Sequence, residues 1–231
     1  DTDDIDFETL ASPSFEVTVT DGEFTDTALV TVNLADVNEA PVLADTILAV
    51  DENRPEGALV ATLAGSDPEG DGLVYSLVAP LDTDGDNVPA FAINPDGTIV
   101  VTDADELDFE TNPVLTLTAM VSDGTLTDEA TVTINLADLN ETPTLADVVL
   151  SADEDAVTGT VIGTLTGVDP EGDPLTYALA QPAFVDTDGD GNAAFEVAPD
   201  GTITVGDTDD IDFETLASPS FEVTVTDGEF T

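Results

Sequence analysis

The segment LTLTAMVSDGTLTDEATVTINL (Leu115–Leu136) contains two stretches in which apolar and polar residues alternate. In the second stretch, Ala130–Leu136, every other residue is aliphatic and the residues between them are Thr or Asn. A period of two is typical of a strand that buries one face, so Val132, Ile134 and Leu136 are predicted to point into a core. The Asp123-Gly124 pair between the stretches is a turn signal. The segment therefore predicts two β-strands joined by a turn.

Alternating stretches of the same kind occur on the N-terminal side of this segment. Turn signals separate them, among them PDG at Pro95–Gly97 and DGD at Asp84–Asp86. About seven short strands per 100 residues, without helical periodicity, predict an all-β chain made of β-sandwiches. The further predicted strands are Thr46–Val50, Ala58–Ala64, Leu73–Val78, Ala90–Ile93 and Thr98–Thr102.

Aromatic residues recur at fixed positions of this pattern. The phenylalanines Phe7, Phe91, Phe109, Phe195 and Phe213 are predicted to fill the cores rather than to bind a ligand. Tyr75 and Tyr177 end equivalent strands and are expected to pack with their hydroxyl groups reaching outward.

The sequence repeats with a period of about 103 residues. Residues 1–25 recur unchanged as residues 207–231, and DPEGD occurs at both Asp67–Asp71 and Asp169–Asp173. Identity between distant copies favours a piece of a long array of near-identical units. The predicted units are the C-terminal part of a repeat (1–38), a complete repeat (39–141) and a repeat lacking its last strand (142–231).

The charge composition excludes several classes of function. The chain has 52 acidic residues, one basic residue (Arg54), no His and no Cys, which gives a net charge of −51. Without basic surface it cannot neutralise phosphates, so nucleic-acid binding is excluded. Without Lys, His or Cys it lacks the common nucleophile pairs and zinc ligands, and we predict no enzyme activity. A hydrophobic content of 41% nevertheless favours a folded chain over a disordered one.

Many of the acids recur at the same place in each unit, beside turns and at strand ends. Carboxylates that converge in this way repel one another by ~1–4 kcal/mol per close pair. Clustering is therefore best explained by a bound cation, and Ca²⁺ accepts six to eight oxygen ligands in irregular geometry. The recurring pairs are Asp51-Glu52 and Asp153-Glu154, Asp67/Glu69 and Asp169/Glu171, and Asp6/Glu8, Asp108/Glu110 and Asp212/Glu214.

The order of motifs xDEN, DPEGD, LDFE, VxDG and DxNEAP resembles a cadherin repeat, in the style of bacterial giant surface adhesins of the RTX-adhesin type. The resemblance covers the whole chain. It implies tandem Ig-like, cadherin-like seven-stranded Greek-key β-sandwiches placed end to end, with Ca²⁺ held at each junction between repeats.

Carried over by motif, the resemblance assigns calcium ligands to two junctions. The linker is one residue shorter than the usual cadherin linker, and Glu replaces Asp in the D-x-D pair, so the number of ions per junction stays open at two or three. The first junction would use Asp6, Glu8, Asp36, Asn38, Glu39, Asp67, Glu69 and Asp123. The second would use Glu52, Asp108, Glu110, Asp138, Asn140, Glu141, Asp169, Glu171 and Asp227.

A separate acidic motif, DTDGDN at Asp82–Asn87 and DTDGDGN at Asp186–Asn192, has acids at positions 1, 3 and 5 of an EF-hand-like loop. The glycine expected at position 6 exists only in the second copy, as Gly191, and neither copy has Glu at position 12. A polar turn explains the motif as well as a metal site does.

The leading functional hypothesis is a calcium-rigidified spacer in an extracellular, cell-surface or secreted bacterial adhesin or fibre. The alternative is a calcium-dependent carbohydrate-binding module, although the chain has no Trp and two Tyr. The expected partners are neighbouring repeats of the same chain. Head-to-tail self-assembly is a further option, in which the strand Ala28–Leu34 of one molecule completes the last repeat of another. The sequence has no apolar run of 18 residues, and we expect no membrane insertion.

Overall fold

The computed structural model describes residues 5–180, 186–214 and 217–231. It divides into two compact units, Asp1–Asp138 and Leu139–Thr231. In the described part nearly all regular structure is β-strand, as predicted, and no helix is long and apolar enough to cross a membrane.

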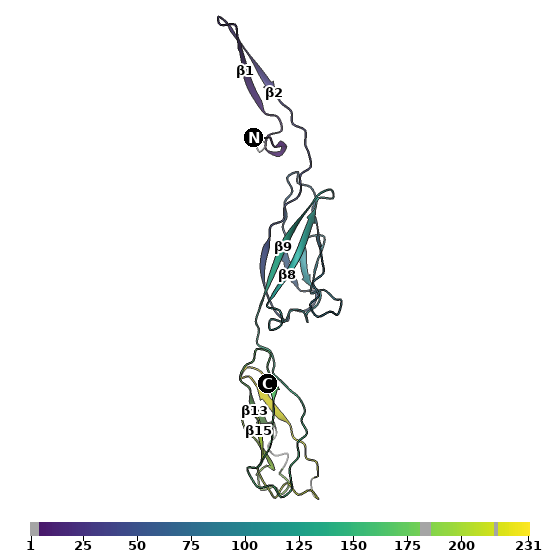
Figure 1. Cartoon of the computed structure of the whole chain (residues 1–231), viewed down its shortest axis with the longest axis vertical. Helices are drawn as coiled ribbons and strands as arrows, with labels where there is room; N and C mark the ends of the chain where they lie inside the picture. The colour runs from purple at the N-terminus through teal and green to yellow at the C-terminus, as the bar shows by residue number, and fades with distance from the viewer. Residues whose placement is uncertain (1–4, 181–185, 215–216) are drawn as a thin grey trace. The chain divides into compact units, whose positions relative to one another are not determined.

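Unit 1 contains a seven-stranded β-sandwich whose strands lie between Thr46 and Ala137, all of them described. One sheet has the strand order β3-β9-β8-β5 and the other β4-β7-β6. The long strands β8 and β9 lie side by side (Figure 1). The seven strands predicted for this region are confirmed, with small shifts at their ends. Their bounds are β3 Thr46–Asp51, β4 Leu59–Thr62, β5 Val74–Leu77, β6 Phe91–Ile93, β7 Thr98–Val101, β8 Val114–Ser122 and β9 Thr127–Ala137.

The inward face of β9 is the one that its sequence predicts. Val132, Ile134 and Leu136 are buried, whereas Thr131 and Asn135 are exposed. Alternate side chains of a strand point to opposite faces of the sheet, so the period-two pattern places its aliphatic set in the core. That core lies between the two sheets and is almost entirely aliphatic, with Phe91 and Leu107 fully buried.

Strand β3 pairs with β9 in parallel, from Thr46 opposite Val132 to Asp51 opposite Ala137. Two acidic side chains accept hydrogen bonds from backbone N–H groups near the start of this pairing. Asp128 accepts a hydrogen bond from the Leu43 N–H at 2.8 Å, and Asp45 accepts one from the Thr131 N–H at 2.7 Å. These aspartates therefore satisfy backbone donors that lie just before the β3–β9 pairing begins.

Unit 2 repeats part of this arrangement: β11-β15-β14 corresponds to β4-β7-β6 and β13-β16 to β5-β8, and its described residues contain no strand equivalent to β3 or β9. Its described strands form the sheets β11-β15-β14, β13-β16 and β10-β12, and Figure 1 labels β13 and β15. The same β-bulge interrupts the β4–β7 pairing in unit 1 and the β11–β15 pairing in unit 2. The bounds are β10 Thr144–Leu145, β11 Val161–Thr164, β12 Gly167–Val168, β13 Thr176–Leu179, β14 Phe195–Val197, β15 Thr202–Val205 and β16 Val223–Thr226.

The first described residues form a helical turn, α1 (Phe7–Leu10), and a hairpin of β1 (Ser14–Thr20) and β2 (Thr25–Thr31). All residues of both strands are exposed. The sequence predicted no helix here. The turn forms because Asp6 caps it, accepting hydrogen bonds from the Glu8 and Thr9 N–H groups at 3.0 and 3.2 Å.

The PDG turns need their glycines. Gly97 and Gly201 have φ of +86° and +82°, a region that side chains disfavour. A Cβ atom on either would also approach a backbone oxygen, that of Leu63 at 2.9 Å or Leu165 at 3.0 Å. Both turns therefore pack closely against the neighbouring strand.

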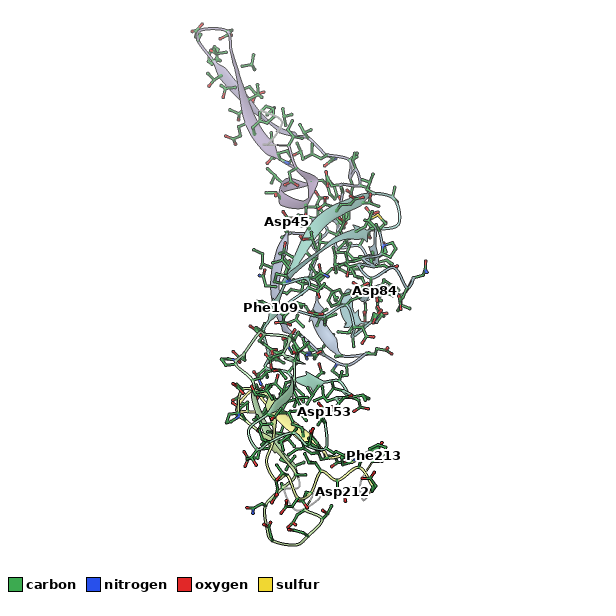
Figure 2. All side chains as sticks on the ribbon, turned by 60° about the horizontal axis from the view of Figure 1, so that its bottom comes forward. Asp45, Asp84, Phe109, Asp153, Asp212 and Phe213 are labelled. Atoms are coloured by element: carbon green, nitrogen blue, oxygen red, sulfur yellow. The ribbon has the colours of Figure 1, made fainter. Side chains whose placement is uncertain are left out.

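The prediction that the recurring phenylalanines fill the cores is wrong for Phe213. Phe91 and Phe195 are buried as expected, and Phe109 is half-buried, but Phe213 is 61% exposed (Figure 2). Leu107 of the LDFE motif and Ile211 of the second IDFE motif fill the core, at 0% and 8% exposure. At Phe213 the turn that follows Asp212 carries the phenylalanine outward, whereas Phe109 still packs against the core.

Contrary to the prediction, the tyrosine hydroxyl groups do not reach outward to solvent. Tyr75 and Tyr177 are both buried, and each hydroxyl accepts a hydrogen bond at 2.7 Å from a glycine N–H, that of Gly65 or Gly167. The hydroxyl group thus satisfies a backbone donor in the segment that follows β4 or β11.

Candidate metal centres

The DPEGD motif of unit 1 presents two carboxylates that are each half satisfied. Asp67 accepts a hydrogen bond from the Asp71 N–H at 3.0 Å, and Glu69 accepts one from the Glu39 N–H at 3.2 Å. The second oxygen of each group, Asp67 Oδ2 and Glu69 Oε2, is buried and has no hydrogen-bond partner among the described residues.

Unit 2 has the same arrangement at the equivalent positions. Asp169 accepts from the Asp173 N–H at 2.8 Å, and Glu171 accepts from the Glu141 N–H at 3.1 Å. Asp169 Oδ2 and Glu171 Oε2 are again buried without a partner in the described part of the chain. An isolated buried carboxylate is destabilising by several kcal/mol unless a cation or a donor compensates it, so a recurring orphaned pair fits a cation site.

The linker asparagines orient toward the aspartates of the VxDG turns. Asn38 donates from Nδ2 to Asp123 Oδ2 at 2.8 Å, and Asn140 donates from Nδ2 to Asp227 Oδ2 at 2.7 Å. These contacts occupy the amide nitrogen and leave the amide oxygen as the atom that could ligate a metal.

Hydrogen bonds keep both VxDG aspartates ionised. The pKa of Asp123 is lowered mainly by the Leu126 N–H and then by Asn38, and that of Asp227 mainly by Asn140 and then by the Phe230 N–H. Each carboxylate is therefore charged and held in place beside the linker.

Three predicted ligands of the first junction come together within unit 1. Carboxylate oxygens of Glu8, Asp36 and Glu69 lie within 4.8 Å of one another. Because Ca²⁺ binds oxygen at about 2.3–2.6 Å, two of its ligand atoms can be up to about 5 Å apart. The spacing of the three groups is therefore compatible with one shared ion.

The crowding of acids changes their protonation. The pKa of Glu39 is raised to about 7, chiefly by its hydrogen bond to the Glu69 carboxylate, then by burial and by repulsion from Glu69, Glu8 and Asp6. The same hydrogen bond lowers the pKa of Glu69. Without a metal, the contact with Glu69 and the surrounding acids therefore favour the protonated form of Glu39 and the ionised form of Glu69.

Unit 1 contributes a second acidic cluster from three other segments. Glu52, Glu110 and Asp138 bring carboxylate oxygens within 4.8 Å of one another. Glu52 is 1% exposed, and its Oε2 accepts a hydrogen bond from the Phe109 N–H at 2.7 Å. The early glutamate and the LDFE motif are thus joined by a hydrogen bond.

The predicted site omitted a third cluster, which lies in unit 2. Glu154, Asp212 and Glu214 have carboxylate oxygens within 4.8 Å of one another, and with Thr208 and Asp209 they line a surface pocket (Figure 2 labels Asp212). Glu154 accepts a hydrogen bond from the Phe213 N–H at 3.1 Å. The signal was available, because these residues are the repeat equivalents of Glu52, Asp108 and Glu110.

Asp6 and Asp108 have a local role that the sequence analysis did not identify. Asp108 accepts hydrogen bonds from the Thr111 N–H at 2.9 Å and the Thr111 hydroxyl at 2.8 Å. Asp6 bonds Thr9 in the same way. In both residues the two carboxylate oxygens already stabilise the turn that carries the neighbouring Glu8 or Glu110.

Three buried acids were also missed: Asp103, Glu106 and Asp210, which are 8%, 2% and 1% exposed. Burial raises the pKa of Asp103, and repulsion from Asp86 and Asp84 adds to this against a hydrogen bond from the Asp105 N–H. These residues lie in acid-rich runs, and no periodicity separates the buried acid from its exposed neighbours.

Comparisons with known proteins agree with this architecture. Residues 38–135 match the bacterial Ig domain family. The human cadherin EGF LAG seven-pass G-type receptor 1 is 34% identical over 132 residues, which is 54% of this chain and 4% of the relative. Human cadherin-24 is 31% identical over 168 residues, 67% of this chain and 19% of the relative. The chain thus spans a fifth or less of the length of these relatives.

Solved structures of cadherin repeats share the fold. Mouse protocadherin-24 EC1-3 superposes with a TM-score of 0.59 at 22% identity, over 96% of this chain and 74% of that one. The protocadherin gammaB7 EC3-6 cis-dimer structure gives a TM-score of 0.57 at 21% identity, over 88% and 52%.

Proposed function

We propose that this chain, whose fold is a tandem array of cadherin-like, Ig-like β-sandwiches, is a calcium-rigidified spacer of an extracellular adhesin or surface fibre. Calcium ions would occupy the acidic clusters where consecutive repeats join. The role is structural and involves no catalysis.

One observation carries the proposal. The DPEGD motif leaves the same two carboxylate oxygens buried and without a partner among the described residues of both units, at Asp67/Glu69 and at Asp169/Glu171. Surface acids solvated by water would not recur with an orphaned oxygen at equivalent positions. With a single basic residue in the chain, protein side chains cannot supply the missing positive charge.

At the first junction the ion would be held by Glu8, Asp36 and Glu69, with Asp67 and the amide oxygen of Asn38 as further donors. All are hard oxygen ligands, which suits Ca²⁺. Bound there, Ca²⁺ supplies positive charge and bonds that link the linker to the turns on either side. At the second junction the repeat pattern assigns the same roles to Glu52, Glu110, Asp138, Asp169 and Glu171.

Calcium at the junctions gives the array its stiffness. Each repeat contacts only its neighbours, so the bending of the chain is decided at the linkers. The ligands lie on turns and linkers outside the aliphatic cores, so loss of the ions would loosen the linkers and leave each sandwich folded.

The carbohydrate-binding alternative gains no support from the tyrosines. A sugar site needs an exposed aromatic face, and Tyr75 and Tyr177 are buried with their hydroxyl groups bonded to backbone N–H groups. The extracellular setting and a bacterial source belong to the proposal, which is supported by the similarity to cadherin extracellular domains and to bacterial Ig domains.

Calcium binding and scattering test the proposal together. We expect millimolar Ca²⁺ to raise the melting temperature, because binding stabilises the folded state by ~2.7 kcal/mol per site at a hundred-fold excess over Kd. Mg²⁺ should have a much smaller effect. EDTA should increase chain flexibility in small-angle scattering without unfolding the sandwiches.

The double variant Asp67→Asn/Glu69→Gln should bind fewer ions and lose part of the calcium-induced rise in melting temperature. Asp96→Asn/Asp200→Asn is a matched control, because both aspartates are exposed acids of the PDG turns. Identical melts in Ca²⁺ and EDTA, or equal calcium binding by both double variants, would overturn the proposal.

A further inference from the structure

The DTDGDN loop between β5 and β6 is an acidic feature outside the junctions. In unit 1, carboxylate oxygens of Asp82 and Asp84 lie within 4.8 Å of one another and of Glu106. Asp84 and Asp86 form an overlapping group with Asp103. Figure 2 shows Asp84 on a loop at the periphery of this unit. Two acids from the segment between β7 and β8 thus meet three from the loop.

The backbone of this loop has the turn that an EF-hand-like loop needs at position 6. Gly191 occupies that position in unit 2 with φ +95°, and Asn87 occupies it in unit 1 with φ +74°. Asn is one of the few residues other than Gly that adopt this conformation readily. The lack of glycine in the first copy is therefore no obstacle to the same loop geometry.

The acid missing from position 12 is supplied by another segment. In unit 1 the Glu106 carboxylate accepts hydrogen bonds from the Thr83 N–H at 2.6 Å and from the Thr83 hydroxyl. In unit 2 the equivalent Asp210 accepts from the N–H groups of Thr187 and Asp188, at 2.6 and 3.2 Å. Both acids are thus held directly against the residues between the first and third positions of the loop.

An unpartnered oxygen at Asp210 points independently to a ligand. Asp210 is 1% exposed, and its Oδ1 makes the contacts to the loop, whereas Oδ2 is buried with no hydrogen-bond partner among the described residues. A deeply buried carboxylate with an unused oxygen, facing a loop of three aspartates, has no compensating positive charge from the protein.

We propose, independently of calcium at the junctions, that each repeat contains an internal Ca²⁺ site formed by its DTDGDN or DTDGDGN loop and closed by the buried acid Glu106 or Asp210. The first, third and fifth residues of the loop are the other carboxylate ligands, with Asp103 as an additional one in unit 1. The donors are all oxygens from flexible loops, which favours Ca²⁺ over Mg²⁺ and over metals that prefer nitrogen or sulfur. The ion would fasten the β5–β6 loop to the segment that leads into β8.

The number of bound ions tests this site directly. Bound Ca²⁺ is measured by equilibrium dialysis and atomic emission on the whole 231-residue chain, in wild type and in Glu106→Gln, Asp210→Asn and the double variant. We expect each single variant to lose one ion per molecule and the double variant to lose two. The control Asp96→Asn/Asp200→Asn, with the same change in charge, should keep the wild-type number. A double variant that keeps the wild-type number overturns the proposal.

Thermal stability distinguishes a ligand from a structural acid. In EDTA, Asp210→Asn should melt at a higher temperature than wild type, because it removes a buried charge that has no counter-ion. In Ca²⁺ its gain in melting temperature should be smaller than that of wild type. A purely structural carboxylate predicts instead the same loss of melting temperature in EDTA and in Ca²⁺, which would also overturn the proposal.

Variants of the junction ligands test the junction sites separately from the internal sites. Asp67→Asn/Glu69→Gln should leave the ions of the loop sites in place. If these variants lose calcium and the Glu106 and Asp210 variants do not, the junction sites stand and the internal site is wrong. The reverse result supports the internal site and removes the junction proposal.

Discussion

Individual carboxylates in this chain differ because of what they touch. Asp123 is kept ionised by N–H donors and by Asn38, whereas Glu39 faces another glutamate and has a pKa raised to about 7. Both lie near the first junction and come from the same acid-rich composition. The local arrangement of donors and charges therefore decides which acid is ready to bind a metal and which one first has to lose a proton.

Substitution of Glu39 should change the dependence of stability on pH. Between its ordinary pKa of 4.5 and about 7, Glu39 binds a proton in the folded state but not in the unfolded state. Without metal, stability from this group therefore falls as pH rises through that window. We expect Glu39→Gln to weaken this fall, measured by calorimetry in EDTA at pH 5 and pH 7.5.

The exposed hairpin variant Glu23→Gln has the same change in charge and should retain the wild-type pH dependence. An unaltered fall of melting temperature with pH in Glu39→Gln would show that the Glu39–Glu69 contact does not form. In saturating Ca²⁺ the sign should reverse, because only ionised carboxylates bind the metal.

At the scale of an element, the parallel pairing of β3 with β9 depends on side chains outside the ladder. Leu43 is 6% exposed, and its N–H group is satisfied by the Asp128 carboxylate rather than by a strand. Asp45 does the same for Thr131 from the opposite side. These reciprocal contacts align the two strands at the point where their pairing begins.

Removal of the Asp128 side chain should loosen the start of β3. Asp128→Ala leaves the buried Leu43 N–H without an acceptor, which we expect to lower the free energy of unfolding by about 1–2 kcal/mol. The amide hydrogen of Leu43 should exchange faster, as measured by hydrogen exchange and urea unfolding. Asp128→Asn keeps an oxygen acceptor and serves as the control. Equal protection of Leu43 in wild type and Asp128→Ala would contradict this role.

The whole molecule carries a net charge of −51, and no rearrangement of side chains can neutralise it internally. Self-repulsion at this density keeps the chain soluble and opposes the compact state. Aliphatic cores oppose that repulsion in both units. Cations from the solvent, whether bound or merely screening, are therefore part of what stabilises the protein.

NaCl and Ca²⁺ should therefore each partly replace the other in reducing the repulsion between carboxylates. In EDTA, we expect the melting temperature to rise as NaCl increases from about 0.05 M to 1 M, because the Debye length shortens to about 3 Å. In saturating Ca²⁺ the same salt range should have a smaller effect, since the closest charges are already neutralised. A salt dependence of equal size in EDTA and in Ca²⁺ would mean that calcium leaves the repulsion unchanged.

The sequence by itself determined the strands and the repeat. Alternation places Val132, Ile134 and Leu136 in the core because successive side chains of a strand point to opposite faces. Repetition predicted the acid pairs of the DPEGD motif, because a motif that recurs in a tandem array occupies the same place in each unit. Both signals are local, and they need no knowledge of how distant segments meet.

Only the tertiary structure decided which acids are buried and which aromatic residues are not. Glu106 and Asp210 lie in runs of acids that look alike, and they are distinguished by packing against a loop more than 20 residues earlier in the chain. Phe213 is carried outward by a turn, and the Tyr75 hydroxyl meets the Gly65 N–H in the segment that connects β4 to β5. Such outcomes depend on contacts between segments distant in sequence, and side-chain type and spacing do not encode them.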